Sequence, residues 1–229
     1  MNSIPYIDIH THSSRSGKDT ITVTNIYPGD GFAAFTGQNF YSVGLHPWHI
    51  GTAEENNEAL RMVESALEFD HVIFVGEAGL DKLKENDFAE QQRVFEAQAF
   101  IAEEYNYPLV VHCVKACNEV IELRKKMKPA MPWIMHSYSG SIEMTQQMLD
   151  LGFLFSFGMN LFSNSAKTIE SFLFLPLNKI FFETDEADSP VETIYKKGAE
   201  LKQVPLEELK YMIWKNFNRI EKSLTGRVR

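Results

Sequence analysis

The chain has 229 residues, of which 44% are hydrophobic and 23% charged, and its formal net charge is −9. Such a composition is that of an ordinary globular protein. The acidic balance excludes tight, extended binding to nucleic acid, which needs a basic stripe. The acidic composition does not exclude an enzyme that acts on a phosphate group, because bound metal ions can supply positive charge locally.

The sequence also bears on the cellular setting. Two cysteines, Cys113 and Cys117, are too few for a disulfide framework, which favours a reducing, cytoplasmic location. The amino-terminal stretch has no basic region followed by a long apolar run, so no signal peptide is predicted. No apolar run approaches the roughly 18 residues of a membrane span. We therefore expect no membrane association, and no obligate protein partner is evident.

In chain order, short runs rich in β-branched and aromatic residues predict eight strands. Several are almost continuously apolar, as in parallel strands covered on both faces. The runs are 5–10, 20–26, 40–46, 71–77, 107–113, 132–138, 152–158 and 179–185.

Segments with helical periodicity lie between most of these strands and after the last one. They are 56–69, 88–105, 118–127, 141–151, 166–175 and 205–224. Strand–helix alternation without an internal linker predicts one α/β domain over residues 1–229, best read as a TIM (β/α)8 barrel, with a doubly wound sheet as the alternative. The nine residues 11–19 are too short for a crossover helix, so we expect the first βα unit to be distorted or to lack its helix.

The first strand carries an unusual polar pattern, YIDIHTHSS at residues 6–14. Strand alternation would point Asp8, His10 and His12 to one face. Buried polar groups need partners, so these histidines are either hydrogen-bonded core residues or ligands of a cation.

Further polar residues fall where the other strands end. Active sites of barrels lie at the carboxyl ends of the strands and draw residues from several of them. Two other histidines, His49 and His71, are interpreted as loop residues. The residues at strand ends are His10, His12, His46, Glu77, His112, His136 and Asp185.

So many imidazoles on one rim predict a pair of divalent cations rather than satisfied core histidines. Four histidines with two carboxylates give three or four protein ligands per metal and leave positions for water. Imidazole-rich ligation suits Zn, Mn, Fe or Ni better than Mg, which prefers oxygen.

Taken together, the motifs resemble those of the TatD-type deoxyribonuclease family within the amidohydrolase superfamily. The resemblance runs from Ile7 to Arg219. Its motifs, in order, are DIHTH (8–12), VGLHPW (43–48), VGEAGLD (75–81), VVHC (110–113), HSYSG (136–140), ETD (183–185) and NFNR (216–219).

The resemblance implies a TIM barrel with a dinuclear site and assigns roles to its residues. His10, His12 and Asp185 would hold one metal. His112 and His136 would hold the other, and Glu77 would bridge both. His46 would lie in an outer shell or face the substrate, and Asp8 would orient a ligand histidine.

Three departures from the family pattern concern the substrate. The arginine that the family commonly has after the fifth strand is absent, and Lys115 is only a possible substitute, which would reach a phosphate as a point charge rather than as a fork. Tyr138 replaces the usual phenylalanine, and Glu186 and Asp188 add acids near the mouth. These changes weaken the case for long polyanionic substrates more than the case for hydrolysis.

The resulting hypothesis is two-metal hydrolysis of a small phosphodiester or a DNA end by a metal-activated water. Asp185 would take the proton of that water, or would be a plain ligand. The aromatic side chains of Trp48, Tyr138 and Phe157 would stack on a base, or would only pack. One alternative is an amidohydrolase-type esterase, lactonase or deacylase acting on a small or aminoacyl substrate. The remoter one is a non-catalytic binding protein on the same scaffold.

Overall fold

The structure is a computed structural model that describes residues 4–13, 17, 19–30, 40–163 and 165–225. The chain divides into two compact units. One consists of residues 25–135, and the other combines residues 1–24 with 136–229. A single domain over residues 1–229 stays a prediction.

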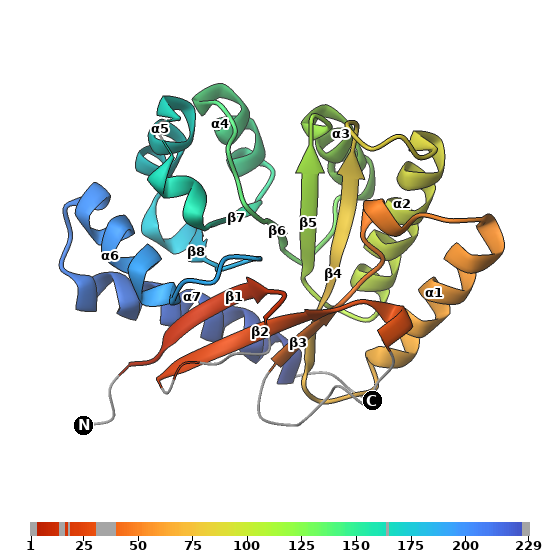
Figure 1. The fold of residues 1–229 in the computed structure, drawn as a ribbon, viewed down its shortest axis with the longest axis horizontal. Coiled ribbons are helices and arrows are strands. Elements are labelled where there is room, and N and C mark those ends of the chain that lie inside the picture. The colour runs from red at the N-terminus through yellow and green to blue at the C-terminus, as the bar shows by residue number, and fades with distance from the viewer. Residues whose placement is uncertain (1–3, 14–16, 18, 31–39, 164, 226–229) are drawn as a thin grey trace. The chain divides into compact units, whose positions relative to one another are not determined.

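The unit of residues 25–135 contains four parallel strands with helices between them. In Figure 1, β4 and β5 lie side by side, and α2 lies next to β4. Every residue of β4 is buried, as expected for a strand covered on both faces. The strands, each paired with the next, are β3 (Phe40–Val43), β4 (Val72–Asp81), β5 (Leu109–Val114) and β6 (Trp133–Met135). The helices are α1 (Ala53–Ala66), α2 (Phe88–Glu104) and α3 (Cys117–Met127).

The other unit joins the two ends of the chain. Strand β1 (Tyr6–Thr11) pairs with β2 (Thr20–Ile26), and β7 (Leu154–Phe157) pairs with β8 (Ile180–Phe182). A parallel bridge between Thr11 and Asp185 links β1 to the chain just after β8. The helices are α4 (Ile142–Asp150), α5 (Ala166–Phe174), α6 (Val191–Lys202) and α7 (Leu206–Thr225).

The predicted fold class is confirmed. The eight predicted strands are present, all described pairings are parallel, and the strand order follows the chain from β1 to β8. Residues 12–19 separate β1 from β2, and those of them that the structure describes are not helical, as predicted for the first βα unit. Short 3-10 helices connect other elements: η1 (Pro28–Asp30), η3 (Pro47–His49), η4 (Met159–Phe162) and η5 (Leu177–Lys179).

Helix α6 is an element that the sequence pattern did not predict. Its interior contains Gly198, a residue that normally weakens a helix. Packing requires the glycine here, because a Cβ at this position would lie 2.5 Å from Cζ of Phe182. The bare backbone of α6 thus lies directly on a ring of β8.

Aromatic rings fill the core of the unit that joins the two ends of the chain. Neighbouring ring centres are 5.0 Å apart between Phe157 and Phe172, 6.0 Å between Phe172 and Phe182, and 4.6 Å between Phe182 and Tyr195. All four side chains are fully buried. Each such pair adds about 0.5–1.5 kcal/mol beyond the burial of its surface.

None of the helices in the described part of the chain has the length and apolar character that crossing a bilayer requires.

Candidate metal sites

Strand β1 contains a bulge that changes which side chains share a face. Asp8 pairs with Thr22, and Thr11 pairs with Thr24, so three steps along β1 match two along β2. An extra residue of this kind breaks strict alternation. The carboxylate of Asp8 and the hydroxyl of Thr11 both contact the hydroxyl of Thr184, at 2.6 and 2.9 Å. Asp8 and Thr11 thus contact the same hydroxyl, which strict alternation along β1 does not predict.

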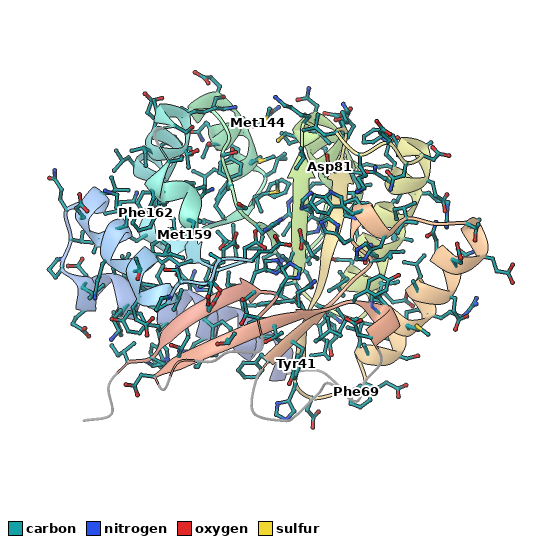
Figure 2. All side chains as sticks on the ribbon, in the orientation of Figure 1. Tyr41, Phe69, Asp81, Met144, Met159 and Phe162 are labelled. Carbon is teal, nitrogen blue, oxygen red and sulfur yellow. The ribbon has the colours of Figure 1, made fainter. Side chains whose placement is uncertain are left out.

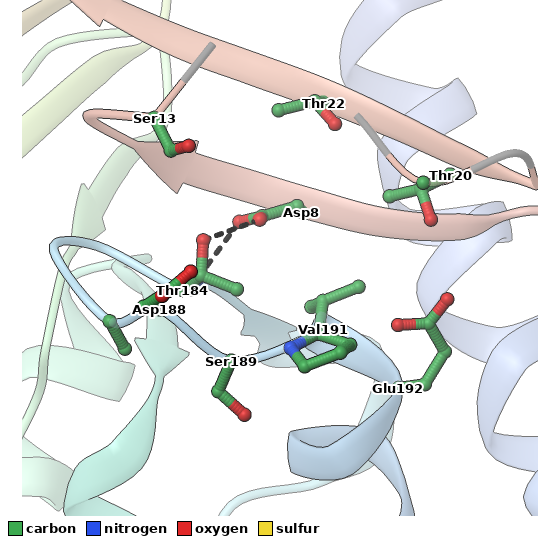
Figure 3. Close-up of a pocket in the computed structure, with 12 residues that line it drawn as sticks. Asp8, Ser13, Thr20, Thr22, Thr184, Asp188, Ser189, Val191 and Glu192 are labelled. Carbon is green, nitrogen blue, oxygen red and sulfur yellow. Dashed lines mark hydrogen bonds between the residues drawn. The ribbon is translucent and has the colours of Figure 1, made fainter. Parts of the chain in front are cut away.

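Asp8 positions the segment after β8. It accepts hydrogen bonds from both the backbone N–H and the hydroxyl of Thr184 (Figure 3), and Thr184 directly precedes Asp185. Burial raises the pKa of Asp8 to about 7, although the bonds from Thr184 work in the opposite direction. The side chain lines a cavity of about 400 Å³ beside the first turn of α6.

Three histidines and an aspartate of the same unit gather at the carboxyl ends of their strands. We call His10, His12, His136 and Asp185 the His10 cluster. Oδ1 of Asp185 lies 3.8 Å from Nε2 of His10 and 3.5 Å from Nε2 of His12. The rings of His10 and His136 are 4.9 Å apart. His10, His136 and Asp185 each offer a ligand atom within 4.8 Å of the others.

Glu183 supports this cluster from inside the core. Its fully buried Oε1 accepts a hydrogen bond from the backbone N–H of Ser137 at 2.6 Å and lies 3.5 Å from Nδ1 of His136. Burial raises the pKa of Glu183, but the hydrogen bond and charge of His136 outweigh burial and leave the pKa below its usual value. A buried carboxylate behind a histidine is the arrangement that orients metal ligands.

A second set of ligand-type side chains lies within residues 25–135. We call His46, Glu77 and His112 the Glu77 cluster. Oε1 of Glu77 lies 2.7 Å from Nδ1 of His112 and 3.2 Å from Nε2 of His46. The three residues offer ligand atoms within 4.8 Å of one another. The backbone N–H of Glu77 donates to Oδ1 of Asn25 at 2.7 Å, which fixes the strand at this point.

Close backbone approach explains why the motif around Glu77 contains a glycine at position 79. Gly79 has φ +159°, and a Cβ added there would lie 1.9 Å from the carbonyl oxygen of His112. Only glycine leaves room for β5 to run this close to β4. This close approach of the two strands brings the side chains of Glu77 and His112 within hydrogen-bond distance.

The structure refines several sequence predictions for single residues. His136 groups with His10 and Asp185, and His46 groups with Glu77, whereas the resemblance implied an outer role for His46. Lys115 is exposed at the turn between β5 and α3. Of the two roles considered for Tyr138 and Phe157, the structure supports packing, because both rings are buried and their centres lie 6.1 Å apart in the core.

Trp48 is 50% exposed and stays available to a substrate. Sequence reasoning missed Glu183 as a support and Asp81 as a partner of His112, whose Nε2 lies 3.7 Å from Oδ2 of Asp81. Both acids stand inside motifs that were noted, ETD and VGEAGLD. Only their burial and contacts reveal what they do.

The donor sets fit divalent transition-metal ions. Each cluster combines imidazole nitrogens with a carboxylate, and His10 and Glu77 are buried. Imidazole with carboxylate suits Zn, Mn, Fe or Ni, whereas Mg prefers an all-oxygen shell. A divalent ion would also offset the cost of burying the carboxylate of Glu77.

Comparisons with known proteins agree with this geometry. The model of a family described as TatD related DNase matches residues 31–222. An uncharacterized metal-dependent hydrolase of Haemophilus influenzae is 28% identical over 80% of this chain and 78% of its own length. The uncharacterized metal-dependent hydrolase YabD of Bacillus subtilis is 26% identical over 79% of this chain and 76% of its own.

A solved structure supports the same fold. The crystal structure of YjjV, a TatD homolog from Escherichia coli, superposes with a TM-score of 0.81 at 22% identity, covering 96% of this chain and 97% of that one. With a family match over most of its length, the chain belongs to the TatD related DNase family.

Proposed function

We propose that the protein is a metal-dependent hydrolase that cleaves a phosphodiester in a small substrate or at a DNA end. The observation that carries this proposal is the pair of histidine–carboxylate clusters in a member of the TatD related DNase family. In a (β/α)8 barrel catalytic residues come from the carboxyl ends of several strands, which is where His10 and His112 lie on β1 and β5. The two cysteines, Cys113 and Cys117, are not joined in a disulfide, and this favours a cytoplasmic location.

The ligands of two divalent ions would come from both clusters. Bound ions of this kind lower the pKa of a water to near neutrality and neutralise charge on phosphoryl oxygens. Asp185 is one-third exposed and would accept the proton of that water and deliver it to the leaving oxygen. Glu183 would hold His136 in its ligand orientation, and Asp8, through Thr184, would hold the backbone next to Asp185.

The test is hydrolysis of bis(4-nitrophenyl) phosphate by protein loaded with Zn, Mn or Mg. We expect Asp185→Asn to lower kcat at least about 100-fold, because a positioned general base contributes 10²–10⁴-fold. Asp188→Asn, in the same loop and exposed, is the matched control and is expected to stay within about twofold of wild type. Full activity of Asp185→Asn would contradict this role.

A second candidate is hydrolysis of a carboxylic ester or lactone. The exposed acids Glu186 and Asp188 favour it, since they disfavour long polyanions, and so does the absence of the family's usual arginine after β5. A 4-nitrophenyl ester and a lactone, assayed beside the phosphodiester, separate the two. Preferential turnover of either would replace the phosphodiester assignment, and turnover of none would indicate a binding protein.

A further inference from the structure

An exposed tryptophan stands beside the Glu77 cluster. Trp48, in η3, has its ring centre 5.2 Å from that of His46 and 6.3 Å from that of His112. Half of its surface is exposed. A large aromatic ring in such a place is either accidental or held there for a ligand.

The contacts of Trp48 show that it is held. Its indole N–H donates to Oδ2 of Asp81 at 2.6 Å, and Oδ1 of Asp81 accepts from the backbone N–H of Leu83 at 2.8 Å. Asp81 is buried at the carboxyl end of β4 (Figure 2). The indole is therefore tied to a rigid strand and not to the loop alone.

A second set of bonds locks the same turn from the side of α2. Gln91 accepts from the backbone N–H of Asp81 at 2.8 Å and donates to its carbonyl at 3.1 Å. Gln91 also donates to Asn86 at 2.5 Å, and Asn86 donates to the carbonyl of Pro47, next to Trp48, at 2.6 Å. Because the Trp48 ring is already fixed before a ligand binds, binding orders it at little cost in conformational entropy.

A cation accompanies the ring. The ammonium of Lys84 lies 4.9 Å from the centre of the Trp48 ring, and the lysine is exposed. The cation–π contact of Lys84 with the Trp48 ring is weak because it is exposed to solvent, and a planar group that stacks on the ring can displace the ammonium. The displaced ammonium would then be free to pair with an anion carried by the same ligand.

We propose that Trp48 and Lys84 form a subsite for a nucleotide, with the base stacked on the indole and its phosphate next to the ammonium. This inference rests on the proposed function and narrows its substrate class, from any phosphodiester to one that contains a nucleoside. Asp81 is the positioning residue of the subsite.

Two probes isolate the contribution of the base. Binding of deoxyadenosine 5′-monophosphate and of deoxyribose 5-phosphate to the full-length protein is measured by calorimetry, with no turnover required. Stacking on an aromatic side chain strengthens binding roughly 5- to 150-fold, so the nucleotide is expected to bind wild type at least 5-fold tighter than the sugar phosphate.

Variants show which residues produce the difference in affinity between the nucleotide and the sugar phosphate. Trp48→Ala is expected to abolish it without changing the affinity for the sugar phosphate, and Trp48→Phe is expected to retain most of it. Lys84→Gln should weaken both probes alike. Asp81→Asn should reduce the ratio and change the Trp48 emission, obtained as the difference between spectra with and without Trp48→Phe. Phe100→Ala, at an exposed ring on α2, is the control and should change nothing.

The outcomes separate this inference from the proposed function. Equal affinities for the two probes, no binding of either, or an unchanged ratio in Trp48→Ala would overturn the subsite, whatever the hydrolysis assay shows. A base-dependent affinity that needs Trp48 would support the subsite even if bis(4-nitrophenyl) phosphate were not cleaved.

Discussion

Glu90 and Arg93 form an i,i+3 ion pair on α2 whose carboxylate also accepts a hydrogen bond from the buried Asn56. The hydrogen bond from Arg93 holds the pKa of Glu90 at about 2, with burial opposing and Asn56 assisting. A pKa below that of the unfolded chain means that the ionised form stabilises the fold. This stabilisation is complete above about pH 4.5 and is lost as the pH falls towards 2.

This residue gives a pH-dependent prediction. Glu90→Gln should lower the free energy of unfolding at pH 7 by about 1–2 kcal/mol, after allowance for solvent screening of a carboxylate that is 18% exposed. The difference from wild type should shrink as the pH falls from 4.5 to 3, measured by urea unfolding. The matched control is Glu58→Gln, which removes another glutamate–arginine pair at i,i+3, with Arg61, at a carboxylate 55% exposed. A loss of equal size in both variants, or one independent of pH, would contradict the assignment.

At the scale of elements, α6 and β8 meet through a glycine and a ring. The Cβ of an alanine at position 198 would lie 2.5 Å from Cζ and 2.9 Å from Cε1 of Phe182, and 3.4 Å from Phe172. The rings are fully buried, so neither can swing away. Steric crowding therefore opposes the gain in helix propensity that alanine normally brings.

We accordingly expect Gly198→Ala to destabilise the protein by about 1–2 kcal/mol, although glycine-to-alanine changes inside helices usually stabilise. Phe182→Leu removes the ring edge that the new methyl group would meet. In a double-mutant cycle by chemical unfolding, Gly198→Ala should cost clearly less in the Phe182→Leu background. Additive effects of the two substitutions would show that the contact does not set the choice of glycine.

Across the whole molecule, sequence patterns predicted the structure best where a residue type is required for a single physical reason. Apolar runs located the eight strands, because buried parallel strands need them on both faces. Histidines at strand ends located both clusters. The sequence did not predict features that depend on a contact between residues distant in the chain. Gly198 reads as a helix breaker until Phe182 is placed against it, and Tyr138 reads as a rim residue until its burial is known.

The bulge in β1 is the clearest such case. Strict alternation along β1 would place Asp8 and Thr11 on opposite faces, and only pairing with β2 shows the extra residue. The roles of Glu183 and Asp81 were missed for a similar reason, because a supporting carboxylate is identified by the atom it contacts and not by its spacing.

The proposed function depends on the binding of divalent ions by the His10 and Glu77 clusters. The most direct test of that binding is elemental analysis of the protein after saturation with Zn or Mn and removal of excess metal. We predict two ions per wild-type chain and about one fewer in His112→Ala and in Asp185→Asn, with folding checked by circular dichroism. A metal-free wild type, or variants that keep both ions, would contradict the account.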